Sequence, residues 1–359
     1  MTLTHLPTAV SRWSSQPFGL VSNAEGFVFL SAYLVGRIYA RKTGDGLAGL
    51  RAPLWRRAFK IYGYHLGILA FAFTVAAAIA VYAQRPMLAN LLDFYLAQPV
   101  LAIVDAVFLI YRPAFFDILP MYVLFMLITP YLLIHGARRG WLSLFSVSLL
   151  IWVGAQFGIR VLLHDGFNTI SPWPLPPLRH LGAFNFYAWQ LLWISGLWLG
   201  QQHVRSPQSI DQMPRAAVNT AVILAVSFLV LRYVVVVYPQ HTSLWWRYGF
   251  NKWDLGPLRM INFIALTVVF IRYGNRLTRR LPTQPLQLLG RASLPVFSAH
   301  VVLSLLVLGL VRDDTQGLSP ALQVFVIVFT FAVLFAIALR DQQRQHPAGT
   351  FAGDVSGQA

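Results

Sequence analysis

Long apolar stretches separated by short basic clusters dominate the pattern of hydrophobic and polar positions along the chain. A bilayer core about 30 Å thick requires roughly 20 mostly apolar residues in each spanning helix. Nine stretches approach this length, so the pattern predicts an all-α polytopic integral membrane protein with about nine transmembrane helices. The predicted helices lie near residues 24–40, 58–83, 117–136, 142–162, 184–202, 215–237, 257–272, 292–311 and 320–339.

A further apolar stretch, residues 91–111, contains Asp93, Asp105 and Pro99. Carboxylates and a proline in mid-stretch are unfavourable in lipid, so we expect a re-entrant or interfacial helix here. Residues 1–340 are expected to form a single membrane domain, because no internal repeat or linker divides them. Residues 341–359 are polar and contain glycine, which predicts a disordered cytoplasmic tail.

Composition agrees with a membrane protein and excludes other classes. The chain is 57% hydrophobic and only 11% charged, against roughly 25% charged residues in soluble domains. An aromatic content of 14% excludes a disordered chain, and the absence of cysteine excludes a disulfide scaffold. The formal net charge is +16, but the basic residues cluster at the ends of apolar stretches. We interpret them as topology signals rather than as a nucleic-acid surface.

The distribution of Lys and Arg predicts the orientation. The loops after the first, third, fifth, seventh and ninth predicted helices hold the larger share of the 28 basic residues, which places them in the cytoplasm of a bacterial inner membrane. Residue 1 and the longer loops 84–116, 163–183 and 238–256 are then outside. An outer start without a signal peptide leads us to expect a further helix of about 15 to 20 residues before Met1.

Polar residues within or beside the apolar stretches are the candidate functional groups, since a charge at membrane depth costs about 2.5–3.5 kcal/mol. Glu25, the only Glu in the chain, opens the first stretch as either a helix-start carboxylate or a functional group. His5 lies at the predicted outer boundary, where an imidazole can act as a general base toward a hydroxyl. His65 and His300 lie inside stretches, where packing between helices is the simpler interpretation.

Basic residues at the cytoplasmic start of the second helix have two interpretations. Arg56 and Arg57 are explained as positive-inside anchors, and guanidinium groups at this place also suit the phosphates of a cytoplasmic donor. The sequence contains no signature of a nucleotide-binding, hydrolase or metalloprotease site, and its histidines show no metal-ligand spacing.

The predicted outer helix ends combine amides and charges with tryptophan. This mixture suits a sugar, because aromatic faces stack on C–H surfaces while polar groups bond hydroxyls, although an interfacial belt also explains the tryptophans. Asp117, at the start of the third helix, is either a helix-start carboxylate or a substrate ligand. The candidate substrate-binding residues are Asp117, Asn185, Gln190, Lys252 and Arg259.

Six strings in the sequence resemble those of one known family in order and in spacing. They are SNAEGFVFLSAYLVG, RRAFKIYGYH, FDILPMYVLF, FNFYAWQLLW, LGPLRMINF and LGRASLPVFSAH. Together they are similar to the OpgC family, which resembles the wider superfamily of multi-span membrane acyltransferases. The resemblance extends from His5 to about residue 340. It implies a role in succinylating osmoregulated periplasmic glucans.

The resemblance also implies site residues. The family pattern has ten spans, and its first helix carries an Arg followed, about ten residues later, by a His taken as catalytic. The string THLPT matches the end of that helix, so His5 takes the place of this His, while the Arg and most of the helix have no counterpart.

The implied reaction transfers an acyl group from a cytoplasmic acyl-CoA, such as succinyl-CoA, to hydroxyls of a periplasmic glucan. His5 is then the general base, Glu25 its orienting carboxylate, and Arg56 and Arg57 hold the donor phosphates. We expect no metal and no permanently bound cofactor. The alternative is a secondary transporter or flippase for a glycan or lipid-linked sugar, in which Glu25 and the histidines relay protons.

Overall fold

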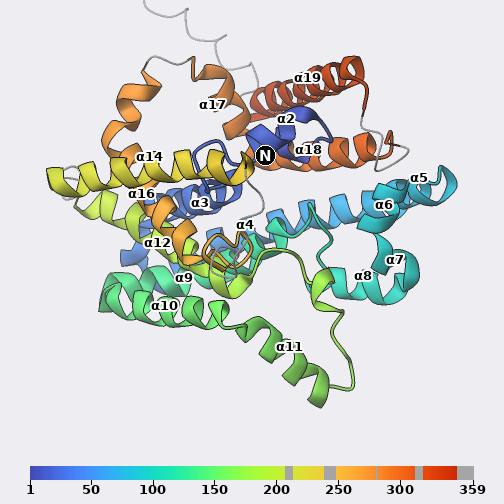
Figure 1. Cartoon of the computed structure of the whole chain (residues 1–359). Coiled ribbons are helices and arrows are strands. Elements are labelled where there is room, and N and C mark those ends of the chain that lie inside the picture. The colour runs from blue at the N-terminus through green and yellow to red at the C-terminus, as the bar shows by residue number, and fades with distance from the viewer. Residues whose placement is uncertain (207–212, 238–247, 280–281, 312–317, 346–359) are drawn as a thin grey trace, which may run out of the picture.

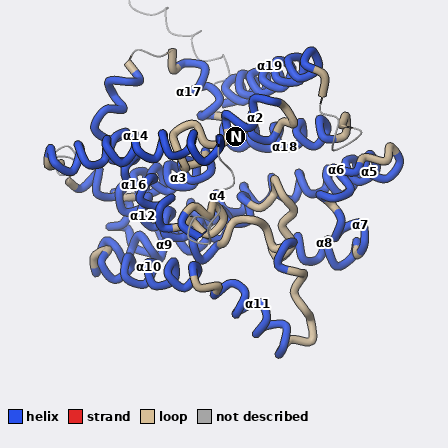
Figure 2. Tube along the Cα trace, viewed as in Figure 1, coloured by secondary structure: helices blue, strands red, loops and turns tan. Residues whose placement is uncertain are grey.

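The computed structural model describes residues 1–206, 213–237, 248–279, 282–311 and 318–345. Over these residues the protein is all-helical, as Figures 1 and 2 show, with one isolated β-bridge between Phe18 and Val21. The predicted all-α class is therefore confirmed for the described part of the chain.

The helices of the first half have short irregular pieces between the long ones. They are α1 (Thr2–His5), α2 (Ala9–Ser14), α3 (Asn23–Tyr39), η1 (Arg41–Asp45), α4 (Gly46–Phe71), η2 (Ala72–Ala76), α5 (Ala77–Tyr82), α6 (Pro86–Leu91), α7 (Asp93–Ala97), α8 (Pro99–Val107), α9 (Ile118–Arg139) and α10 (Leu142–Gln156). The remaining elements are α11 (Ile159–Ile170), η3 (Leu178–His180), α12 (Phe186–Arg205), α14 (Arg215–Val237), α16 (Pro257–Thr278), α17 (Gln284–Arg291), α18 (Ser293–Leu308) and α19 (Pro320–Gln345).

Among the described residues, five helices are long and apolar enough to cross a membrane, or up to seven if each of two bent pairs forms one span. The five lie at Arg41–Tyr82, Ile118–Arg139, Arg215–Val234, Pro257–Arg276 and Pro320–Arg344. Every predicted span contains helix, but the count of nine is not confirmed. With 17 residues, α3 is shorter than each of the five, and α12 is not among them although it has 20 residues.

The prediction of one continuous helix over residues 142–162 is wrong. Helix α10 ends at Gln156, and α11 starts at Ile159 and runs 79° away from it. Gly158 between them has a φ of +81°, a left-handed conformation that glycine adopts without steric cost. Apolar composition continues through this corner, so hydrophobicity did not reveal it. Helices α17 and α18 are bent similarly, by 89°.

Residues 91–111 are not one straight span. The segment lies in the short helices α6, α7 and α8, and prolines begin two of them, Pro86 and Pro99. A proline at the first helical position lacks only a donor that would be unpaired there, so it starts a helix readily and ends the preceding one. The prediction that this stretch departs from a simple transmembrane helix agrees with this break.

Glycines bring α3 and α12 into close contact. A Cβ atom at Gly36 would collide with the main chain of Leu197, and Cβ atoms at Gly196 and Gly200 would collide with the main chain of α3. Small residues let helix backbones approach and gain dispersion energy where lipid offers no hydrophobic driving force. The small residues predicted to support close packing in the first stretch therefore do so at Gly36. In Figure 1, α3 and α12 lie together beside α14 and α16.

Hydrogen bonds and one ion pair join the segments between helices into two sets, one at each end of the helices, in agreement with the predicted orientation. One end holds the pairs Tyr33–His203, Thr43–Arg205 and Trp141–Gln201. The other end holds the pairs Asn185–Asp254, His180–Asp93 and Arg112–His180. The predicted outer loops thus share one end, which is called the outer end below. Helix α19 continues to Gln345, past the predicted boundary at residue 340, and residues 346–359 lie outside the described residues.

Candidate functional site

A pair of histidines joins the start of the chain to its second-last helix. The Nδ1 atom of His5, at the end of α1, lies 2.9 Å from the Nε2 atom of His300 in the middle of α18. Their rings are nearly parallel, with centroids 5.1 Å apart. Leu6 follows His5 and is buried in a small cluster with Val307 and Val311. This apolar anchor holds the short helix α1 against α18.

The hydrogen-bond pattern assigns a tautomer to both rings. A hydrogen bond between two ring nitrogens needs one donor and one acceptor, so His5 and His300 are not both fully protonated. The main-chain carbonyl of Phe297, one turn back, is the neighbour of the other His300 nitrogen, and it can only accept. In the tautomer that matches this neighbour, His300 Nε2 is the acceptor and His5 Nδ1 carries the donated proton. That tautomer leaves a lone pair on His5 Nε2.

Aromatic rings surround the histidine pair. Phe115 contacts His5 edge-on at 4.7 Å, Phe297 contacts His300 edge-on at 4.9 Å, and Phe27 stacks on Phe297 at 6.1 Å. Phe115 has a φ of +72°, which is rare for a residue with a bulky side chain. Such a conformation persists only where surrounding contacts enforce it. The pair therefore lies in an apolar environment that strengthens electrostatic interactions.

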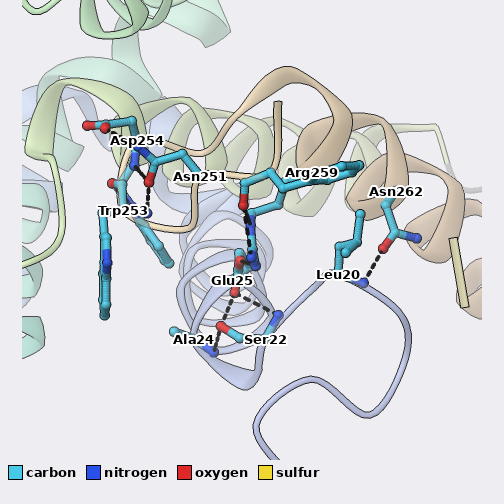
Figure 3. A network of polar contacts seen from close by, with 11 residues as sticks. Leu20, Ser22, Ala24, Glu25, Asn251, Trp253, Asp254, Arg259 and Asn262 are labelled. Atoms are coloured by element: carbon cyan, nitrogen blue, oxygen red, sulfur yellow. Dashed lines mark hydrogen bonds and ion pairs between the residues drawn. The ribbon is translucent and has the colours of Figure 1, made fainter. Parts of the chain in front are cut away.

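Glu25 forms a closed network, drawn in Figure 3. Its Oε2 accepts hydrogen bonds from the main-chain N–H of Ser22, at 3.0 Å, and from the Ser22 hydroxyl, which completes a capping box at the start of α3. Its Oε1 lies 2.6 Å from Nη1 of Arg259 in α16. Arg259 also donates to the main-chain oxygen of Phe250 from Nε and Nη2, both at 3.3 Å.

The expectation that Glu25 orients His5 is not met, because the carboxylate bonds Ser22 and Arg259 while His5 bonds His300. Glu25 and Arg259 are both buried. Their ion pair neutralises the two charges and joins α3 to α16. The interpretation of Glu25 as a helix-start carboxylate is correct. Its ion-pair partner is Arg259, which the sequence had suggested as a substrate ligand. Charge alone did not distinguish a buried structural pair from a binding site.

Lys252 lies in the loop before α16. Its Nζ atom lies 4.6 Å from the ring centre of Trp253, a cation–π contact. Burial lowers the pKa of Lys252 from its usual value, and the nearby carboxylate of Glu25 opposes this shift. A half-buried amine with this lowered pKa remains a candidate for substrate contact.

The two amides predicted to bind substrate make internal hydrogen bonds instead. Asn185 caps α12 through the N–H of Tyr187 and donates to Oδ1 of Asp254 at 2.7 Å. Gln190 accepts from the Ser148 hydroxyl at 2.6 Å and donates to the main-chain oxygens of Ser148 and Tyr187. The reason in both cases is burial, since an amide enclosed between helices needs protein partners. Gln190 thereby joins α10 to α12.

Asp117 stands immediately before α9, as predicted, and is buried. Its Oδ2 accepts from the main-chain N–H of Ala183 at 3.0 Å, across to the loop before α12. Burial raises the pKa of Asp117 from 3.8 to about 6, while the Ala183 hydrogen bond and the charge of Arg112 act in the opposite direction. Asp117 thus fixes the loop behind the outer-end cavity.

This cavity has a volume of about 1180 Å³ and three arginines in its wall, Arg112, Arg160 and Arg179. Arg160 donates from Nη2 to the main-chain oxygens of Leu178 and Gly182, at 3.2 and 2.7 Å. The lining also includes the aromatic rings of Tyr248 and Trp253 and the loop residue Ala114, next to Phe115. The 112–115 loop therefore connects the cavity to the ring that contacts His5.

A second cavity is mainly apolar. It has a volume of about 670 Å³ and follows α3 between α12 and α16, from Met1 and Ser22 to Tyr33 and His203. Tyr33 and His203 are hydrogen-bonded at 3.2 Å and belong to the end opposite the arginine-lined cavity. The groove therefore runs along α3 from the region of Glu25 toward the predicted cytoplasmic end.

The protein-family comparison supplies the classification of the chain. A family model described as OpgC protein matches residues 1–346, which is nearly the whole sequence. The chain belongs to the OpgC family. No curated protein and no solved structure matches it. Membership suggests a glucan-modifying acyltransferase-type function.

In this OpgC family member, Arg56 and Arg57 project from the exposed face of α4, whereas Leu54 and Ala58 on the same helix are buried. Exposed arginines at one edge of a helix are typical of interfacial anchors. Binding of donor phosphates by these residues stays a prediction.

Sequence reasoning missed the residues that distinguish the outer end of this OpgC protein. Arg160 lies inside a stretch predicted as a continuous span, and a charge there was a signal that the span is interrupted. Arg112 lies in the YRPAFF string just before the third predicted helix, where it resembled a loop residue. No pattern in the sequence paired His300 with His5, because the two residues are separated by 295 positions.

Proposed function

We propose that this OpgC protein is a membrane O-acyltransferase of the bacterial inner membrane. It transfers an acyl group, such as succinyl, from a cytoplasmic acyl-CoA to hydroxyls of a periplasmic glucan or related glycan. The observation that carries the proposal is the His5–His300 pair, which leaves a lone pair on His5 Nε2 in an aromatic environment. Family membership supports the acyltransferase class.

In the proposed reaction, His5 Nε2 removes the proton from a sugar hydroxyl as the hydroxyl oxygen attacks the thioester carbonyl carbon. A carbon–oxygen bond forms, the carbon–sulfur bond breaks, and the leaving thiolate takes the proton back from His5. His300 accepts the hydrogen bond from His5 Nδ1 throughout and stabilises the imidazolium that forms between these steps. His300 is therefore a positioning residue.

The two cavities support separate approaches for the two substrates. The groove along α3 suits the narrow pantetheine arm of an acyl-CoA by its shape, because it extends from Tyr33 and His203 to Met1 and Ser22. The phosphates of the donor would remain outside it, with Arg56 and Arg57 as the proposed ligands. The outer-end cavity combines arginine and amide side chains with the aromatic rings of Tyr248 and Trp253, which suits a saccharide.

The direct test is transfer of a labelled acyl group from acyl-CoA to glucan by the purified protein in proteoliposomes. His5→Ala should reduce the rate about 100- to 10,000-fold, because removal of a general base has effects of this size. His135→Ala is the matched control, since His135 bonds Ser143 away from the pair and should leave the rate unchanged. Glycan uptake without any acyl transfer would contradict the proposal and favour the transporter alternative.

A cellular measurement complements this test. Glucan extracted from cells lacking the protein should carry fewer acidic substituents than glucan from the parent strain, as resolved by anion-exchange chromatography. An unchanged charge profile in a strain that makes substituted glucan would count against the enzyme.

A further inference from the structure

The polar wall of the outer-end cavity offers hydrogen-bond donors rather than acceptors. The one lining carboxylate among the described residues, Asp254, accepts from Asn185 at 2.7 Å and from Asn251 at 2.6 Å. The Asn251 oxygen accepts from the main-chain N–H groups of Trp253 and Asp254. Both amides are thus oriented by Asp254 and its loop, and the charged hydrogen-bond donors of the lining are the arginines.

Arg112 has a hydrogen-bond donor that the described residues leave unused. Its Nε atom is buried and has no hydrogen-bond partner among the described residues. A buried donor without a partner forgoes the hydrogen bonds it would make to water, a penalty of about 1–3 kcal/mol. Burial and the nearby charge of Arg160 lower the pKa of Arg112 to about 10, whereas Asp117 opposes the shift.

The remaining arginines are only partly compensated. Arg160 donates hydrogen bonds to main-chain carbonyl oxygens, and the carboxylates of Asp254 and Asp117 lie near it but accept no hydrogen bond from it in the described part of the chain. Arg179 bonds the ring of His180 and lies 3.7 Å from Asp93, in an exposed pair that contributes little. Asp117, the nearest other acid, uses Oδ2 for Ala183. Among the described residues, the wall of this cavity therefore contains three guanidinium groups and one carboxylate, Asp254, an excess of positive charge.

We propose that this cavity binds an oxyanion, a carboxylate or a phosphate, carried by a saccharide, with Arg112 and Arg160 as its principal ligands. Guanidinium groups bind such anions through paired hydrogen bonds, while Trp253 and Tyr248 in the wall provide faces for sugar rings. This inference rests on the proposed function, because it makes the acceptor an acidic glycan rather than a neutral one. The protein then acts on chains that already bear negative substituents.

The test measures equilibrium binding to the full-length protein in nanodiscs of zwitterionic lipid. The probes are maltotetraose, maltotetraose bearing one phosphate, maltotetraose bearing one succinyl ester, and glycerol 3-phosphate. Both anionic saccharides should bind at least about tenfold more tightly than the neutral one. Arg112→Gln and, separately, Arg160→Gln should remove this preference, so that neutral and anionic saccharides bind the same variant with nearly equal dissociation constants.

The matched control is Arg139→Gln, an exposed arginine at the far end of α9, which should keep the full preference. Two variants are used so that failure of one to fold leaves the other informative. Equal binding of neutral and anionic saccharides overturns the proposal, as does an unchanged preference in both variants. The measurement is repeated in a second set of nanodiscs that contain phosphatidylglycerol. Loss of saccharide binding there, with glycerol 3-phosphate binding as well as the anionic saccharides in the zwitterionic nanodiscs, would identify a lipid headgroup as the occupant and would also overturn the proposal.

Binding requires no acyl donor, so this measurement is independent of catalysis. His5→Ala should retain the preference for anionic saccharides although it loses acyl transfer. An absence of acyl transfer together with an intact preference would reject the proposed function and keep the binding site.

Discussion

The Glu25–Arg259 pair and the outer-end arginines are both clusters of buried charge, but they differ in what is left over. Glu25 bonds Ser22 and Arg259, and Arg259 bonds Phe250, so the hydrogen bonds of this network close within the chain. Arg112 instead has a buried donor with no partner among the described residues, beside a large cavity. A network whose hydrogen bonds are all made within the chain holds helices together, whereas an unused hydrogen-bond donor at a cavity indicates a ligand.

Removing the Glu25 charge should have a larger effect on the free energy of unfolding than any other change considered. Glu25→Gln preserves the capping box, because Gln also accepts from Ser22, but leaves the Arg259 charge buried without its partner. We expect a loss of about 3–5 kcal/mol in unfolding free energy. Tryptophan fluorescence during denaturation in detergent measures it, and the double variant with Arg259→Gln should lose less than the sum of the single variants. A loss below about 1 kcal/mol would mean that the pair does not stabilise the fold.

Asp117 is intermediate between the fully bonded Glu25 and the partly unbonded Arg112, because one of its oxygens is hydrogen-bonded and a cation lies nearby. Burial raises its pKa to about 6, so the folded protein holds the proton more tightly than the unfolded chain. The resulting stabilisation is complete below about pH 4 and is lost as pH rises through about 6. The wild type should therefore lose up to about 3 kcal/mol relative to Asp117→Asn between pH 4 and 7. Parallel melting temperatures of the two proteins across this range would refute the shift.

The His5–His300 pair differs from the arginines, because its unused hydrogen-bonding group is an acceptor, the lone pair on His5 Nε2, rather than a donor. His300→Leu removes the acceptor for His5 Nδ1 and should lower kcat for acyl transfer by about tenfold or more. His300→Gln offers an amide oxygen in the same region and should restore part of the rate. The pH profile of kcat/KM should shift in the Leu variant, and an unshifted profile with lower protein yield would mean that His300 only packs.

The smallest expected effect concerns Arg112. Arg112→Gln removes a buried charge whose Nε has no partner among the described residues, so little stabilising energy is lost. We expect the unfolding free energy to change by less than about 1 kcal/mol, with stabilisation as the more favourable direction. Differential scanning fluorimetry of the detergent-solubilised variants measures this. A loss comparable to that of Glu25→Gln would show that Arg112 has a structural partner and would weaken the comparison.

Particular elements show how far sequence reasoning extended. Residues 118–136 and 320–339 of two predicted spans lie within the helices α9 and α19, because long apolar runs are a direct signal of helix and of burial in lipid. Residues 142–162 were predicted as one helix and form two, because a single left-handed glycine turns the chain without changing its hydrophobicity. Bends and close contacts depend on backbone conformation and on the partner helix.

The amino-acid sequence was sufficient to predict that the protein is helical and which loops lie at the same end. It also placed Glu25, His5 and Asp117 at helix ends. These properties follow from local composition and from charge beside apolar runs. Only the tertiary structure decided which polar groups meet. It joined His5 to His300 and Glu25 to Arg259, and it left Arg112 facing a cavity. The physical reason is that hydrogen bonds and ion pairs act over a few ångströms between residues that lie far apart in the chain, so helix packing selects the partners.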